Sequence, residues 1–118
     1  MSKILVVDYD LDILTVVELV LAHNGFSVSS TLKWEEIPRL IKTFSPDLIL
    51  LDVSLSGADG REICEKLKSA DDTKHIPIIL FSAHHNFIND MRGCKPDGMV
   101  TKPFDVPFLI ETIKKNIA

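Results

Sequence analysis

Several apolar runs of the sequence end at polar side chains whose types could do chemistry together. These are Asp8 after residues 4–7, Asp52 after residues 48–51, Ser82 after residues 78–81, and Lys102 just past residues 99–100. In open sheets of parallel strands, ligands bind outside the carboxyl ends of the strands. Two carboxylates, a hydroxyl and an ammonium group would therefore meet at one edge of such a sheet.

The two carboxylates indicate a cation site. Asp8 and Asp52, if unpaired in a buried setting, would repel each other and be costly to desolvate. A bound cation resolves that conflict, and carboxylates, water and phosphate are ligands that suit Mg²⁺. Beside a metal, the Asp52 carboxylate could act as a nucleophile toward a phosphoryl group. Lys102 and the Ser82 hydroxyl would then stabilise the transferred oxygens.

Other polar residues are assigned plainer roles. Asp10 precedes an apolar helical segment and is predicted to be its N-cap. His84 and its neighbour His85 are predicted to be an exposed loop pair, because adjacent side chains rarely share one metal ion. His84 follows Ser82 closely enough to influence the lifetime of a phosphoryl group. Trp34 is expected to lie away from the site.

The elements that must position these side chains alternate along the chain. Continuous apolar runs are typical of strands covered by helices on both faces. Strands are predicted at 4–7, 26–29, 48–51, 78–81 and 99–100, and helices from 11 to a stop at 24–25, at about 34–44, after Asp59, near 87–94 and after Asp105. This alternation predicts an open α/β sheet with right-handed crossovers.

Composition limits the function. The chain has 118 residues and a formal net charge of -4, so we expect one domain over residues 1–118 and no direct binding of nucleic acid, which needs a basic surface. Cys64 and Cys94 have no spacing that indicates a disulfide framework or a zinc site, which favours a reducing, cytoplasmic location. No run is long enough for a signal peptide or a membrane span.

Four stretches together resemble the receiver domain of two-component response regulators, over essentially the whole chain. They are ILVVD at 4–8, PDLILLDVSLSGADG at 46–60, IPIILFSA at 76–83 and TKPF at 101–104. The resemblance implies a doubly wound, five-stranded parallel sheet of order 2-1-3-4-5, a flavodoxin-like arrangement with the active site at its switch point. It also implies a cis peptide bond between Lys102 and Pro103.

The resemblance implies roles for the site residues. Asp52 would accept a phosphoryl group from a sensor histidine kinase or phosphotransfer protein, with Mg²⁺ held by Asp8, Asp52 and the backbone carbonyl of Ser54. Ser82 and Lys102 would be the catalytic partners. The signal would be a conformational change on the face of the fourth helix, fifth strand and fifth helix, recognised by a downstream protein. Such a chain modifies only itself and turns over no metabolite.

Three departures from the family pattern are visible. Tyr9 stands where the family has a second acid, so we expect weakened Mg²⁺ binding, with Asp10 as a substitute ligand. Met99 stands at the switch position, which is normally aromatic. The stretch from 82 to 102 is about two residues shorter than is common. These departures leave an alternative open, a pseudo-receiver that acts as a phosphorylation-independent protein-interaction module.

Overall fold

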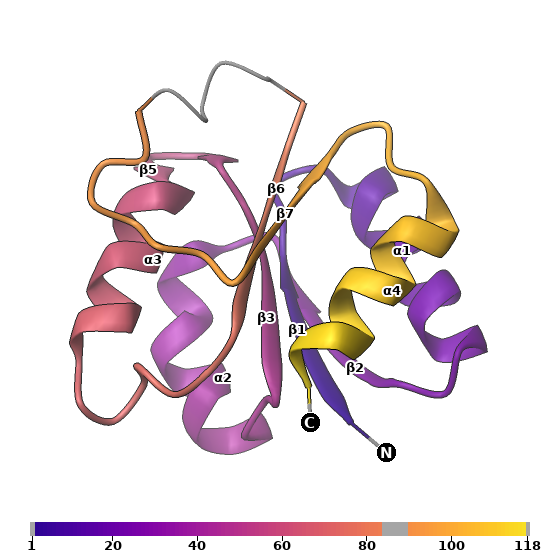
Figure 1. Cartoon of the computed structure of the whole chain (residues 1–118), viewed down its shortest axis with the longest axis horizontal. Helices are drawn as coiled ribbons and strands as arrows, with labels where there is room; N and C mark the ends of the chain where they lie inside the picture. The colour runs from indigo at the N-terminus through magenta and orange to yellow at the C-terminus, as the bar shows by residue number, and fades with distance from the viewer. Residues whose placement is uncertain (1, 84–89, 118) are drawn as a thin grey trace.

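A five-stranded parallel sheet forms the centre of the fold (Figure 1). The computed structural model describes residues 2–83 and 90–117. In spatial order the strands are β2 (Ser27–Thr31), β1 (Lys3–Val7), β3 (Leu48–Asp52), β6 (Ile78–Ser82) and β7 (Gly98–Thr101). All four neighbouring pairs are parallel. The predicted α/β fold and its strand order are therefore confirmed.

Helices cover both faces of the sheet (Figure 1). On one face lie α1 (Leu11–His23) and α4 (Val106–Asn116), and on the other lie α2 (Ile37–Phe44) and α3 (Gly60–Ser69). Side chains alternate along β1, so that Val6 packs in the first layer and Val7 in the second. Because β3 and β6 are buried on both faces, their sequences are almost continuously apolar.

The helix boundaries follow from local chemistry. Asp10 caps α1, since its side chain accepts from the backbone N–H groups of Asp12 and Ile13, as predicted. Gly25, with a φ of 88°, then turns the chain away toward β2. The second helix begins later than expected. Residues 34–36 form a separate 3₁₀ turn, η1, and Pro38 lies in the first turn of α2, where its missing N–H costs nothing.

A small antiparallel hairpin, absent from the prediction, connects the sheet to α3. It consists of β4 (Ser54–Leu55) and β5 (Ala58–Asp59). The Asp59 side chain caps α3 by accepting from the N–H of Arg61. The hairpin thus carries the chain from the end of β3 directly to the next helix.

Two predictions need correction. The helix expected near 87–94 falls partly on residues 84–89, outside the described residues; its described part, 90–94, forms a turn that includes Arg92 at a φ of 51°. The spacing of Cys64 and Cys94 indicated no disulfide framework, but the two form a disulfide with a Cα–Cα distance of 5.6 Å. Sequence spacing did not reveal it because tertiary packing of residues 90–97 against α3 brings the two together.

No helix within residues 2–83 and 90–117 is long and apolar enough to span a membrane.

Candidate functional site

The predicted site residues meet at the carboxyl edge of the sheet. Parallel pairing aligns the ends of the central strands, with Asp52 opposite Phe81 in β6 and Ser82 opposite Thr101 in β7. Asp8, Asp52 and Ser82 are only 2%, 6% and 1% exposed. Polar side chains at such depth need partners, because burying an unpaired charge is expensive.

Lys102 links the two carboxylates. Its Nζ lies 2.7 Å from Oδ2 of Asp8 and 3.3 Å from Oδ2 of Asp52. The same ammonium lies 4.9 Å from the centre of the Phe81 ring, and the Lys102 backbone N–H donates to the carbonyl of Ser82. The peptide bond between Lys102 and Pro103 is cis, as the resemblance implied. One cation thus faces two carboxylates, and the cluster has a net negative charge.

Burial and the neighbouring charges together shift the pKa of Asp52. Burial, and next the negative charge of Asp8, raise the pKa of the Asp52 carboxyl from its ordinary value of 3.8 to about 6, while Lys102 opposes the rise. Near neutral pH the carboxyl is ionised but destabilised relative to water. A second cation would relieve that cost.

Asp8 is held by the backbone around it. Its N–H donates to the carbonyl of Thr31, and its Oδ1 accepts from the N–H of Asp10. The Asp10 carboxylate is exposed and engaged at the N-terminus of α1. The Asp10 carboxylate therefore caps α1 in this structure, while its backbone N–H contacts Asp8.

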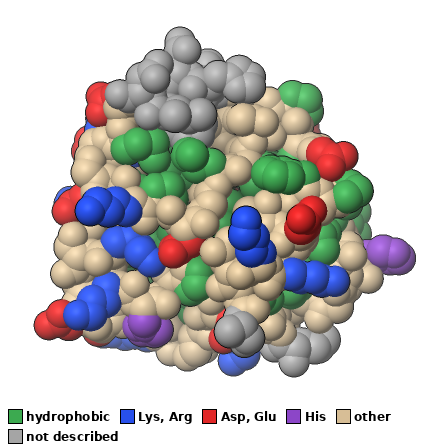
Figure 2. All heavy atoms as spheres, in the orientation of Figure 1, with side chains coloured by type: hydrophobic (Ala, Val, Ile, Leu, Met, Phe, Trp, Pro, Cys, Tyr) green, Lys and Arg blue, Asp and Glu red, His purple; other side chains and the backbone are tan. Residues whose placement is uncertain are grey.

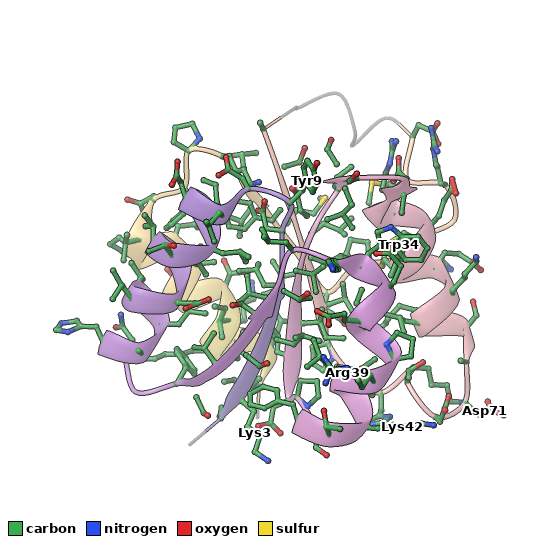
Figure 3. The ribbon with its side chains drawn as sticks, turned by 180° about the vertical axis from the view of Figure 1, so that it is seen from behind. Lys3, Tyr9, Trp34, Arg39, Lys42 and Asp71 are labelled. Carbon is green, nitrogen blue, oxygen red and sulfur yellow. A yellow bond between two sulfur atoms is a disulfide. The ribbon has the colours of Figure 1, made fainter. Side chains whose placement is uncertain are left out.

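The remaining predicted residues surround the pair at different depths. The N–H of Ser54 donates to Oδ1 of Asp52 at 3.3 Å, so the start of the hairpin lies beside the acid. Tyr9 is 60% exposed and lies at the same end of the molecule as the site, opposite Lys3 (Figure 3). Met99 on β7 is 37% exposed. His84 lies outside the described residues.

Two residues contact the chain at Asp52 or in the hairpin that follows it, and neither contact was predicted. The indole N–H of Trp34 donates to the carbonyl of Ser56 in the turn between β4 and β5, the hairpin that starts beside Asp52. Gly60 begins α3 so close to Asp52 that a Cβ there would lie 2.1 Å from the Asp52 carbonyl oxygen. In the sequence, only the Asp59-Gly60 pair indicated that the backbone comes this close to Asp52.

The donor set fits a hard cation with few protein ligands. Among the residues that the structure describes, no three His, Cys, Asp or Glu side chains are grouped as a metal site. Asp8 and Asp52 form a buried carboxylate pair that faces the single ammonium group of Lys102. Mg²⁺ commonly binds through one or two carboxylates and retains several waters. A third protein ligand would come from backbone near Ser54.

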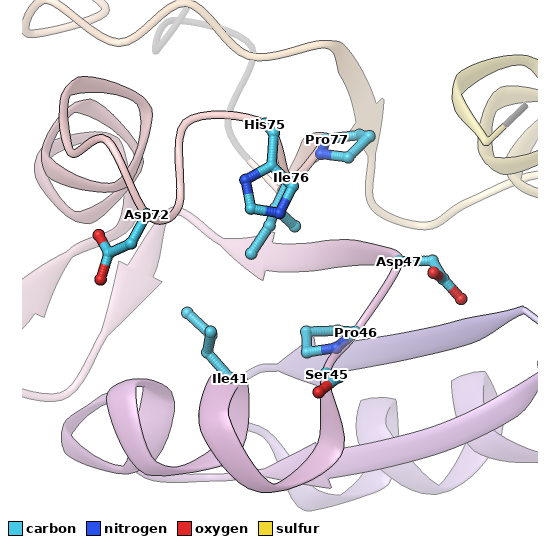
Figure 4. Close-up of a pocket in the computed structure, with 8 residues that line it drawn as sticks. All are labelled: Ile41, Ser45, Pro46, Asp47, Asp72, His75, Ile76 and Pro77. Carbon is cyan, nitrogen blue, oxygen red and sulfur yellow. The ribbon is translucent and has the colours of Figure 1, made fainter.

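A hollow of about 400 Å³ lies at the opposite edge of the sheet (Figure 4). Pro46 and Pro77, which precede β3 and β6, line it together with residues such as His75 and Asp72. Because it opens at the amino ends of the strands, it is separate from the carboxylate pair.

A parallel sheet of this order, with two buried acids and a lysine at its carboxyl edge, defines the class of CheY-like receiver proteins. Comparison with protein families agrees, since the model of the response regulator receiver domain matches residues 4–114. The chain belongs to the response regulator receiver domain family.

Solved structures show the same fold. The N-terminal signal receiver domain of a two-component response regulator from Bacteroides fragilis is 25% identical, with a TM-score of 0.87 and coverage of 100% of this chain and 98% of that one. The signal receiver domain of a histidine kinase from Syntrophus aciditrophicus is also 25% identical, with a TM-score of 0.89 and coverage of 98% and 89%. Vibrio cholerae CheY4 shares 22% identity, a TM-score of 0.88 and coverage of 99% of each chain.

Proposed function

We propose that this chain is a phosphoacceptor of a two-component phosphorelay and that Asp52 accepts the phosphoryl group. The observation that carries the proposal is the placement of Lys102, whose ammonium lies within 3.3 Å of both Asp8 and Asp52 at the switch point of the sheet. The donor would be a sensor histidine kinase or phosphotransfer protein, in the cytoplasm, as membership of the family suggests.

The transfer balances as a single substitution at phosphorus. A carboxylate oxygen of Asp52 forms the new bond to phosphorus, and the bond from phosphorus to the donor's imidazole nitrogen breaks. The leaving nitrogen keeps the electron pair and takes a proton. Asp52 can act as the nucleophile because its carboxylate is ionised above a pKa of about 6 yet poorly stabilised by its surroundings.

The neighbouring residues would stabilise the product. Lys102 would pair with the phosphoryl oxygens, and the Ser82 hydroxyl would donate to one of them. Asp8, Asp52 and the backbone at Ser54 would hold Mg²⁺. When bound, Mg²⁺ would neutralise negative charge on the phosphoryl group.

The readout would be a protein-binding surface. Lys102 and Ser82 lie at the ends of β7 and β6, so moving either side chain toward a phosphoryl group perturbs the chain around β7 and the start of α4. Phe104 follows Lys102 and packs edge-on against Phe81, with ring centres 5.4 Å apart. We propose a shift between two states of this face, recognised by a downstream protein, with no turnover of a separate substrate.

Intact-protein mass spectrometry after incubation with acetyl phosphate tests the proposal. We expect one phosphoryl adduct that requires Mg²⁺ and is absent in Asp52→Asn. Asp72→Asn, which changes an exposed carboxylate far from the site, is the matched control and should be modified like the unaltered chain. The absence of an adduct, under conditions that modify another receiver domain, would contradict the proposal.

One observation favours the alternative of a pseudo-receiver. Tyr9 presents an exposed phenol where an acid would complete the metal site. In that case the chain would bind its partner equally well with and without acetyl phosphate, and Mg²⁺ would not change that binding.

A further inference from the structure

The chain between β6 and β7 packs along α3 through one covalent and several polar contacts. Cys94 belongs to neither a helix nor a strand, and its sulfur is bonded to that of Cys64 in the middle of α3. Both cysteines are buried among apolar residues of the layer that α2 and α3 cover. Residues 90–97 are therefore fastened to the outer helix of this layer.

The polar contacts on either side of the disulfide are partly exposed. Arg92 pairs with Glu62 at 2.8 Å, and Lys68 pairs with Asp97 at 2.9 Å. Arg61 donates to the carbonyl of Asp90. Figure 2 shows charged side chains of both signs gathered on the side of the molecule where α3 lies. Because exposed ion pairs contribute little each, the disulfide is the dominant link between residues 90–97 and α3.

This link joins the two elements that flank the candidate site. Residues 90–97 lead straight into β7, and the N–H of Asp97 bonds to the carbonyl of Ile78 at the start of β6. At its other end, α3 begins at Gly60, whose N–H donates to the carbonyl of Val53 next to Asp52. A change in the placement of residues 90–97 therefore reaches both α3 and β7.

We propose that Cys64 and Cys94 form a reversible redox site, opened by a dithiol reductant, whose state determines whether residues 90–97 are held against α3. The sulfur–sulfur bond takes up two electrons and two protons to give two thiols, and the dithiol is oxidised to its own disulfide. The sequence has no other cysteine, so the pair cannot rearrange within the chain. The inference goes beyond the proposed phosphoryl transfer and does not depend on it.

Access of a reductant to the two sulfurs depends on local opening of residues 90–97. Cys64 is fully buried and Cys94 is 4% exposed, so a reductant reaches them only when residues 90–97 move away from α3. Segments outside helices and strands open locally at a lower free energy than the core does. Reduction would then remove the covalent tether and leave the polar contacts and the apolar packing around Cys94 to return the segment.

Amide hydrogen exchange of the full chain, before and after reduction by dithiothreitol in native buffer, tests the proposal. Alkylation and mass spectrometry first count the thiols, and two are expected. We then expect protection of residues 90–97 to fall at least about tenfold further than protection of β1 and β3. Reoxidation with oxidised glutathione should restore it. The Cys64→Ala/Cys94→Ala double variant should match the reduced chain and not respond to dithiothreitol.

Three results would overturn the proposal. If thiols appear only in denaturant, the disulfide is not a redox site of the folded chain. If two thiols form and exchange of residues 90–97 is unchanged, the disulfide does not hold the segment. If protection of residues 90–97 falls no further than that of β1 and β3, the disulfide acts only on the global stability of the fold and does not hold this segment in particular. Because reduction is also measured on the unaltered chain, poor folding of the double variant would not prevent a decision.

Discussion

Replacing Asp52 with asparagine should stabilise the fold at neutral pH. The folded pKa of about 6, against 3.8 in the ordinary carboxyl, means that ionised Asp52 is disfavoured by burial and by Asp8 even after the attraction of Lys102. The difference corresponds to about 3 kcal/mol. Asparagine has nearly the same shape and no charge, so it avoids this cost while the contact between Asp8 and Lys102 stays in place.

The sign of the pH dependence follows from proton binding. Between pH 3.8 and about 6 the folded chain binds more protons at Asp52 than the unfolded chain does, so stability falls as the pH rises through this window. The advantage of Asp52→Asn should therefore be about 3 kcal/mol at pH 7.5 and shrink to about 1 kcal/mol at pH 4.5. Titrations common to both proteins cancel in the difference.

Urea unfolding followed by circular dichroism, with a chelator present, measures this difference between pH 4.5 and 8. Asp72→Asn is the control for removing one negative charge from the chain. Because Asp72 is exposed, its variant should differ from the unaltered chain by at most about 0.5 kcal/mol. The reasoning would be refuted if the difference in free energy of unfolding between Asp52→Asn and the unaltered chain did not change with pH. It would also be refuted if Asp52→Asn were less stable than the unaltered chain at pH 7.5.

The other predictions concern Mg²⁺ binding, the start of α3 at Gly60 and the disulfide. Tyr9→Asp should tighten Mg²⁺ binding by about tenfold in calorimetry, because it adds a carboxylate ligand, and unchanged affinity would contradict the proposed metal position. Gly60→Ala should lower the free energy of unfolding in urea by about 2–3 kcal/mol, because its Cβ would meet the Asp52 carbonyl. A loss below about 0.5 kcal/mol would contradict this reasoning. Cys64→Ala/Cys94→Ala should lower the free energy of unfolding by about 3.6 kcal/mol, because the unfolded chain gains the entropy of an open loop of 30 residues. An unchanged free energy of unfolding would show that closing this loop does not stabilise the fold.

The sheet could be predicted because its signals are local. The runs before Asp8, Asp52 and Ser82 are apolar on both faces, and a strand covered by helices on both sides requires that pattern. Each run ends at a polar residue, so the edge at which they meet followed from parallel topology. Asp10 was predictable as a cap for the same reason, since capping depends only on the next three residues.

Contacts that depend on tertiary packing could not be predicted in this way. The Cys64–Cys94 disulfide forms across 30 residues, and nothing in the spacing indicates that residues 90–97 pack along α3. The indole N–H of Trp34 donates to the hairpin carbonyl of Ser56, a contact that depends on the 3₁₀ turn η1 before α2. The hairpin itself consists of two strands of two residues each, too short to leave a periodic pattern.

The residues of the candidate site could be predicted from the sequence, but the distances between their side chains could not. The sequence brought Asp8, Asp52, Ser82 and Lys102 to one edge, whereas the bridging of both acids by one ammonium depends on side-chain placement. The roles of these residues in phosphoryl transfer stay predictions.

The most direct test of the central claim is to locate the phosphoryl group. Loss of the adduct in Asp52→Asn could also follow from loss of a metal ligand, so the position must be read from the unaltered chain. After acetyl phosphate treatment with Mg²⁺, reduction by borohydride converts an aspartyl phosphate to a stable alcohol, and tandem mass spectrometry of the digested chain finds it. We predict that the alcohol is at Asp52 and nowhere else. An alcohol at Asp8 or another residue, with Asp52 unchanged, would contradict the account.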